Sequence, residues 1–178
     1  MLSNFCRKAY VANDNKEQKM NKYFKITTIA YLILLGTTLG AGLFTGIVVA
    51  PVTFHTEAWL GSEILSHYQE GLIMTQNFVK LSYLVNVVLI AVALYEGYKY
   101  KKFERDTITQ IATFFVFATG LLFSQYYIPD ILTMQMAGEE MTKSVAFINT
   151  HKGSEINFKI FSFALLVLMV RNMQKACK

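Results

Sequence analysis

The sequence predicts an all-α integral membrane protein, a four-helix bundle with amphipathic helices in its outer loops. Of its 178 residues 53% are hydrophobic and only 16% are charged. A soluble domain typically carries about 25% charged residues. The charge deficit is concentrated in four long apolar stretches, each close to the roughly 20 residues that a helix needs to cross a bilayer. These observations favour lipid over an unusually large soluble core.

Each stretch is predicted to be one membrane-spanning helix. The stretches are residues 26–50, 72–95, 109–128 and 156–170. The first and third contain no charged residue, and Lys80 is the single charge in the second. The fourth contains Lys159, whose stem can lie along lipid while its ammonium reaches the interface. Glu155, four residues earlier, is placed to pair with it on one helix face.

Most of the positive charge falls on one side of this arrangement. Residues 1–25, 96–108 and 171–178 contain 13 of the 17 Lys and Arg residues. Short loops rich in these residues stay cytoplasmic, so we expect a plasma (inner) membrane protein with both termini inside. The chain then divides into a basic cytoplasmic N-terminal segment (1–25), a four-helix transmembrane domain (26–171) and a basic cytoplasmic tail (172–178). The net charge of +5 requires no nucleic acid, because anionic lipid is a sufficient partner.

The start of the chain has a second interpretation. Residues 20–35, MNKYFKITTIAYLILL, resemble the basic front and apolar middle of a secretory signal. The apolar part is longer than the about 7 to 15 residues usual for a signal, and Pro51 makes a poor cleavage site, so we expect a retained helix. Cys6 and Cys177 fall on the predicted cytoplasmic side, where thiols remain reduced.

Small residues are concentrated in the first predicted span. On a helical wheel they line one side of the helix: Gly36, Gly40, Gly42, Gly46 and Ala50, with Pro51 following. Because little hydrophobic force acts between helices in lipid, close backbone approach at small residues carries much of their packing. Two GxxxG rows therefore predict that the first helix is the packed centre of the bundle or a dimer seam, and we favour packing within the chain.

Polar residues within the spans are few. Asn86 lies near mid-depth and is expected to hydrogen-bond to a neighbouring helix, since an unsatisfied amide in hydrocarbon costs several kcal/mol. Such groups serve as contacts between helices or line a small-solute path. Thr107 and Gln110 have capping-box spacing at the start of the third span, and Pro129 suits its end.

All three histidines fall on the predicted outer side. His55, His67 and His151 are accompanied there by Trp59 and seven of the twelve acidic residues. Imidazole with carboxylate suits a transition metal, so these histidines are the candidate metal ligands. Their spacing matches no HExxH-type pattern, which favours surface or capping roles.

The outer segments also show helical periodicity. Apolar residues recur at helical spacing from Ile64 to Leu72 and from Ile131 to Ile148. Amphipathic helices lying at the membrane interface fit this pattern. They are expected to cover the outer end of the bundle.

The segment LGAGLFTGIVVAPVTF, residues 39–54, together with the loop and long helix after it, resembles the transmembrane-protein-205-like family, a domain of unknown function. Gly42, Ala50, Pro51 and Phe54 carry the shared small-residue element, and the resemblance covers residues 28–130. It implies four membrane helices but no settled reaction.

Membrane proteins of the copper-resistance-D and protoporphyrinogen-oxidase kind are similar in size, but they rely on histidines within helices. Here no histidine lies within a predicted span, so haem would need the boundary histidines as ligands. We therefore expect no cofactor and a non-enzymatic protein that binds a partner protein or handles a small solute. The alternatives are a haem- or metal-dependent membrane oxidoreductase with an outer-face site and a structural homo-oligomer.

Overall fold

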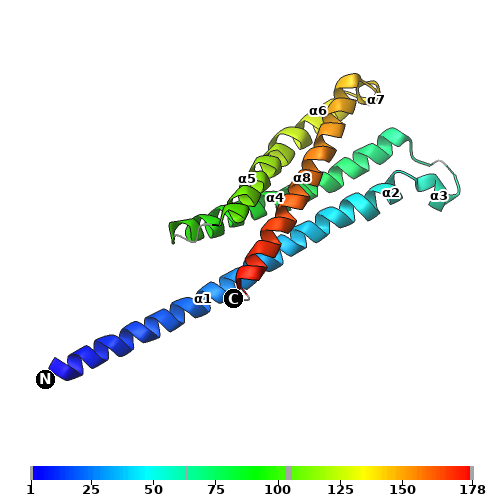
Figure 1. Cartoon of the computed structure of the whole chain (residues 1–178). Helices are drawn as coiled ribbons and strands as arrows, with labels where there is room; N and C mark the ends of the chain where they lie inside the picture. Colours follow the sequence, from blue (N-terminus) through cyan, green and yellow to red (C-terminus); the bar gives the residue numbers. More distant parts are fainter. Residues whose placement is uncertain (1, 63, 103–105, 177–178) are drawn as a thin grey trace.

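A computed structural model describes residues 2–62, 64–102 and 106–176, with side chains from Tyr23 onward. All regular elements in these ranges are helices (Figure 1). In chain order they are α1 (Leu2–Phe44), the π-helix η1 (Thr45–Val49), α2 (Ala50–Thr53), α3 (Thr56–Leu60), α4 (His67–Lys101), α5 (Thr107–Leu121), the π-helix η2 (Leu122–Tyr127), α6 (Ile128–Met136), α7 (Glu139–Thr142) and α8 (Val145–Ala176). The side chains of residues 1–22 and of Cys177 lie outside the described part.

Four helical stretches among the described residues are long and apolar enough to cross a membrane: Tyr23–Thr53, His67–Lys101, Thr107–Met136 and Val145–Ala176. The predicted all-α membrane bundle is therefore confirmed. At about 1.5 Å per residue, each stretch exceeds the roughly 30 Å of a hydrocarbon core. Their end turns consequently extend toward the aqueous boundary.

The spans are longer than the apolar stretches that predicted them. The second predicted span ended at Tyr95, but α4 continues through Glu96 and Lys99. The fourth begins at Val145, eleven residues earlier than predicted. Most residues expected in separate outer amphipathic helices belong instead to the ends of these long helices, and only the short α3 and α7 lie between them.

Both prolines lie within continuous helical stretches, each just after a π-helical turn. Proline in a helix lacks an N–H, and its ring clashes with the carbonyl four residues earlier. That carbonyl belongs to Ile47 for Pro51 and to Gln125 for Pro129, and both lie in the π-helices η1 and η2. Local π geometry lets the helix continue past a proline. The expectation that the third helix stops at Pro129 is therefore wrong, because the helix runs on to Met136.

Side chains define the starts of two spans. Ser66 forms a capping box with Gln69 at the start of α4. For α5 the capping residue is Asp106, whose carboxylate accepts from the backbone N–H of Thr109. The predicted box starting at Thr107 is thus replaced by a cap one residue earlier.

The most extensive helix packing in the described part involves α8, not the first helix. Helix α8 packs against α1, α5 and α6, and its contact with α5 is the most extensive between any two helices of the described part. Phe161, Leu165 and Leu168 of α8 are fully buried. In the apolar window of the first span only 17% of residues are buried, against 33% to 39% in the other three. The expectation that the first helix is the packed centre is wrong for this chain.

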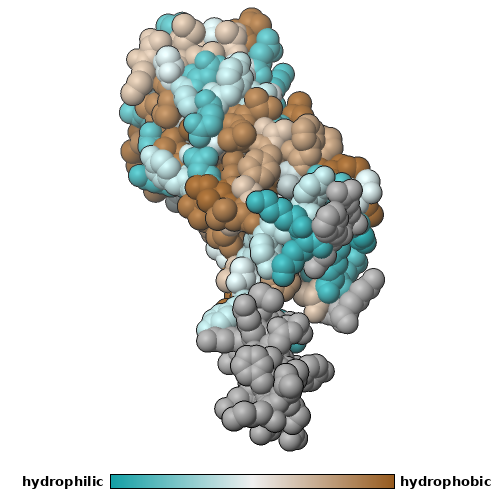
Figure 2. Space-filling model, turned by 90° about the vertical axis from the view of Figure 1, so that its left-hand side faces the viewer, coloured by the Kyte–Doolittle hydropathy of each residue, from teal (hydrophilic) through white to brown (hydrophobic). Residues whose placement is uncertain are grey.

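Large apolar side chains remain exposed along all four spans. Figure 2 shows hydrophobic residues across the middle of one face, hydrophilic residues gathered below them, and a mixture of both kinds above. Such a surface fits surroundings of lipid. In Figure 1 the last turns of α4 and α8 and the first turn of α5 lie toward one end, called here the terminal end, and α2, α3, α6 and α7 lie toward the other, called here the loop end.

Candidate functional site

A cluster of buried polar side chains links three helices at the terminal end. Glu96 and Lys99 of α4 lie one turn apart, with Lys99 Nζ 3.9 Å from a Glu96 oxygen. Asn172 of α8 bridges them: its Oδ1 accepts from Lys99 Nζ at 2.7 Å and its Nδ2 donates to Glu96 at 2.8 Å. Tyr31 of α1 donates its hydroxyl to Glu96 at 3.1 Å. All four side chains are buried.

Aromatic packing holds this cluster against α1. The rings of Tyr31 and Tyr95 stack with centroids 4.0 Å apart. The Tyr95 hydroxyl lies 2.8 Å from Thr28 Oγ1, and Lys99 Nζ lies 5.4 Å from the centroid of the Tyr95 ring. The ring face adds a cation–π attraction for the buried ammonium.

A second charged group joins α5 to α8 beside this cluster. Asp106, the cap of α5, accepts from Arg171 at 3.0 Å and lies 3.3 Å from Lys175 Nζ. Thr109 donates its hydroxyl to the same carboxylate at 2.6 Å. Hydrogen bonds first from Arg171, then from Thr109 and Lys175, hold the pKa of Asp106 well below its usual range.

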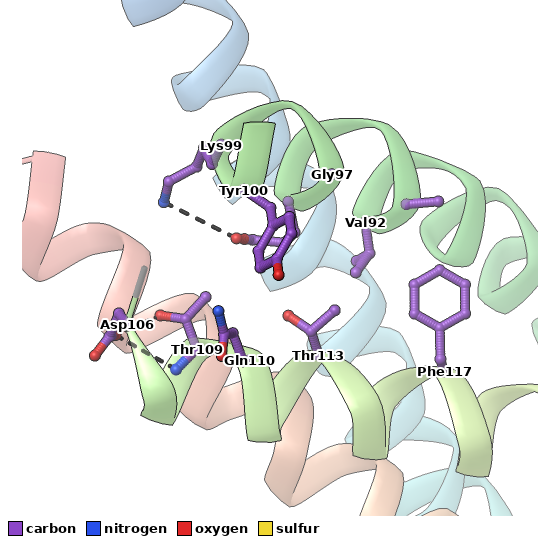
Figure 3. A pocket seen from close by; sticks show the side chains of 11 residues that line it. Val92, Gly97, Lys99, Tyr100, Asp106, Thr109, Gln110, Thr113 and Phe117 are labelled. Carbon is purple, nitrogen blue, oxygen red and sulfur yellow. Dashed lines mark hydrogen bonds and ion pairs between the residues drawn. The ribbon is translucent and has the colours of Figure 1, made fainter. Parts of the chain in front are cut away.

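A pocket of about 340 Å³ lies between α4 and α5 next to both groups. Figure 3 shows side chains from the two helices facing one another across it. Its lining residues are Val92, Ala93, Glu96, Gly97, Lys99, Tyr100, Asp106, Thr109, Gln110, Thr113 and Phe117.

The pocket is polar at one end and apolar at the other. In Figure 3 Asp106, Thr109 and Gln110 lie at one end, while Val92 and Phe117 lie at the opposite end. Val92 and Phe117 are farther from the ends of their helices, and therefore deeper in the spans, than the charged residues are. The two ends of the pocket therefore differ in polarity.

The predicted metal ligands lie apart from this site, at the loop end. Each histidine lies near a glutamate of its own neighbourhood: His55 by Glu57 at 3.7 Å, His67 by Glu70 at 3.5 Å and His151 by Glu155 at 3.9 Å. Within the described residues no three His, Cys, Asp or Glu side chains form a group able to hold a metal ion. The structure thus does not bring the three histidines together as one ligand set.

Two of the predicted packing glycines contact α8. A Cβ added to Gly42 would lie 2.8 Å from the Phe158 ring, and one added to Gly36 would lie 3.6 Å from Met169. Nothing within the described chain lies within 4 Å of the corresponding point at Gly40 or Gly46.

The wheel that grouped these glycines assumed one regular helix. The π-helical turn that begins at Thr45 places an extra residue in the helix, which rotates later positions by about 100°. A role for Gly40 and Gly46 in a homo-oligomer remains a prediction. Ala50 is half-buried and Pro51 is exposed.

α5 also approaches its neighbours closely at Gly120, a glycine that the sequence did not single out. A Cβ at Gly120 would lie 2.8 Å from Leu89 and 3.1 Å from Phe161. Asn86 Oδ1 accepts from Gln125 Nε2 at 3.4 Å, which links α4 to the third span.

Sequence reasoning missed the site at the terminal end because it assigned Glu96 and Lys99 to a loop. A signal was present: the two charges follow an apolar helix at a spacing of three, so they share one helix face. Asn172 lies just beyond the predicted fourth span and carried no pattern of its own.

A family model described as a domain of unknown function, DUF4149, matches residues 33–140, which is more than half of the chain. The chain belongs to the DUF4149 family. The match includes every residue that lines the pocket, whereas Tyr31 and α8 lie outside it. Comparisons with curated proteins and with solved structures gave no match. The narrower transmembrane-protein-205-like label remains a resemblance, and DUF4149, a domain of unknown function, assigns no activity to the chain.

Proposed function

We propose that this DUF4149 chain is a non-enzymatic membrane protein that binds a small amphipathic molecule in the pocket between α4 and α5. The observation that carries the proposal is the 340 Å³ cavity, whose wall includes the buried pair Glu96 and Lys99. A polar end near the aqueous boundary and an apolar end within the span match an amphiphile aligned with the lipids around it.

The buried charges support a functional role because they are costly in this position. Removing two charges from water costs several kcal/mol per ion, and their attraction repays this only with good geometry and further hydrogen bonds. A buried ion pair is therefore weak evidence for stability, and its position in a pocket wall makes it a candidate for binding. Tyr31 and Asn172 supply the additional hydrogen bonds here.

The exposed part of the pocket wall supports entry from the bilayer. Ala93 and Gly97 lie on the exposed side of α4 and are both pocket residues. Neither presents a bulky side chain that would close the cavity from that side. On the predicted topology the polar end of the bound molecule lies at the cytoplasmic leaflet.

The experiment fills the pocket without disturbing the fold. Nothing lies within 4 Å of a Cβ added at Gly97, and leucine is favoured over glycine in a helix by about 1 kcal/mol. Gly97→Leu should therefore fold and narrow the cavity. The matched control is Gly40→Leu, which also has open space around its Cβ and lies on α1, away from the pocket.

The probe is aminoanthracene, a small apolar fluorophore with one polar group, titrated into the purified protein in detergent. We expect saturable fluorescence enhancement with one site per chain for the unaltered protein and for Gly40→Leu, and at least a tenfold weaker affinity for Gly97→Leu. Equal binding by all three proteins, or no saturable binding by any, would contradict the proposal.

A further inference from the structure

Thr113 of α5 lines the pocket and has an unusual hydroxyl. Its Oγ1 is buried and has no hydrogen-bond partner among the described residues. Elsewhere on α5, Thr119 bonds back to the carbonyl of Phe115 at 2.6 Å and Thr109 donates to Asp106 at 2.6 Å. A buried hydroxyl without a hydrogen bond lowers stability by about 1–3 kcal/mol. A bound molecule that supplies the missing hydrogen bond would remove this cost.

The charged groups around the pocket already have partners. Lys99 donates to Asn172 at 2.7 Å, and Glu96 accepts from Asn172 at 2.8 Å. Asp106 lies within 3.3 Å of both Arg171 and Lys175. A charged headgroup would have to displace one of these internal partners, whereas a neutral one would not.

A neutral polar position lies one helical turn from Thr113. Gln110 is an exposed pocket residue on the same face of α5, at a spacing of three. Its amide offers both a donor and an acceptor. Together the two side chains form an uncharged hydrogen-bonding edge between the charged end and the apolar end at Phe117.

We propose that the pocket selects a neutral lipid-soluble molecule whose head presents a hydroxyl or carbonyl oxygen, and that Thr113 is the residue that recognises it. The inference rests on the proposed function and specifies its ligand class. Thr113 lies between Gln110 and Phe117 along the pocket (Figure 3), where the head of such a molecule would join its body. The apolar body of the ligand then lies along Val92 and Phe117.

The test places a fluorescent reporter in the pocket. Trp59 is the single tryptophan, so the Trp59→Phe variant has no tryptophan fluorescence of its own. Phe117→Trp then reports from the pocket wall, while Phe114→Trp reports from a residue that is 65% exposed on the same helix. Tyr100→Trp is a second pocket reporter that does not depend on the packing of Phe117.

The quenchers share one brominated alkyl chain and differ in their head groups. They are ω-bromodecanol, methyl ω-bromodecanoate, ω-bromodecylsulfonate and ω-bromodecyltrimethylammonium, each added to vesicles at the same membrane concentration. The first presents a hydroxyl and the second a carbonyl, so comparing their quenching shows which of these two neutral oxygens the pocket prefers. The other two carry permanent charges of opposite sign.

We expect a neutral probe to quench the pocket reporter with about fivefold higher affinity than either charged probe, the ratio that one hydrogen bond supplies. Quenching of the reporter at position 114 should depend only on the concentration of the probe in the membrane and not on its head group. Thr113→Val, which preserves the side-chain shape, should abolish the preference without lowering stability, because it removes an unpaired buried hydroxyl. Thr113→Ser should retain the preference.

Two outcomes separate the inference from the proposed function. If quenching at the pocket is abolished by Gly97→Leu but favours a charged head, or is unchanged by Thr113→Val, the ligand class is wrong and the pocket still binds. If quenching at the pocket reporters is the same in Gly97→Leu, the proposed function fails as well.

Discussion

Removing Lys99 from the buried cluster is expected to destabilise the protein far more than its single charge would on the surface. In Lys99→Met the ammonium no longer donates to Asn172, and the Glu96 carboxylate remains buried without its neighbouring cation. The side chains of Lys99 and Glu96 are only 5% and 9% exposed, so solvent screens them little. Breaking a buried ion pair from one side costs about 3–5 kcal/mol.

Replacing both partners should recover much of this loss. In the double variant Glu96→Gln with Lys99→Met no charge remains in the pair, and the new side-chain amide oxygen at position 96 can still accept from Tyr31 and Asn172. Substituting both members of a buried pair is often nearly neutral. We therefore expect the double variant to be about 2 kcal/mol more stable than Lys99→Met alone.

The assay is thermal unfolding in detergent followed by circular dichroism, with denaturant titration for the free energy of unfolding. About 3 kcal/mol corresponds to a fall in Tm of roughly 6–12 °C for a chain of this size. Lys101→Met, an exposed lysine on the same helix, is the control and should change stability by less than about 0.5 kcal/mol. A double variant no more stable than Lys99→Met would refute the coupling inferred from the structure.

The remaining predictions concern pH, packing and topology. Because hydrogen bonds lower the pKa of Asp106 in the folded state, its contribution to stability is complete above the ordinary value of about 3.9 and is lost as pH falls toward the lowered one. The free energy of unfolding, measured from pH 6 to about pH 3, should therefore fall, and it should fall less in Asp106→Asn. The same fall in both proteins would contradict this prediction. Gly120→Leu should destabilise by at least about 1–3 kcal/mol through overpacking, since even a Cβ there is too close to its neighbours, whereas Gly40→Ala should be neutral or slightly stabilising in thermal unfolding. A membrane-impermeant thiol reagent should label Cys6 and Cys177 from the same side of the membrane, as four spans require, and labelling from opposite sides would exclude the predicted topology.

The number of membrane helices could be predicted from the sequence because lipid imposes a simple rule on composition. A chain in hydrocarbon must satisfy its backbone hydrogen bonds within the segment and present apolar side chains outward. The four charge-poor stretches meet that requirement, and each lies within one helical stretch of the structure. Their ends could not be predicted in this way, because the outermost turns of long helices leave the hydrocarbon and tolerate charge. Glu96 and Val145 mark two such ends.

Two local predictions were wrong for a related reason, because both assumed regular α-helix where the structure has π-helical turns. Pro129 is a stop signal in a regular α-helix, but a π-helical turn accommodates it here. The same kind of turn near Gly46 breaks the regular 100° spacing on which the glycine wheel depended. Both outcomes depend on neighbouring helices, which support irregular backbone within a membrane.

By itself the sequence determined that the helices are surrounded by lipid and that there are four membrane helices. Both follow from the length and polarity of continuous segments. Only the tertiary structure decided which helix packs most extensively and which polar side chains meet. Glu96 and Asn172 are 76 residues apart, and their hydrogen bond exists because α4 and α8 bring their terminal ends to one place. Helix packing depends on shape contacts between distant residues, and a single chain's hydropathy pattern contains no record of them.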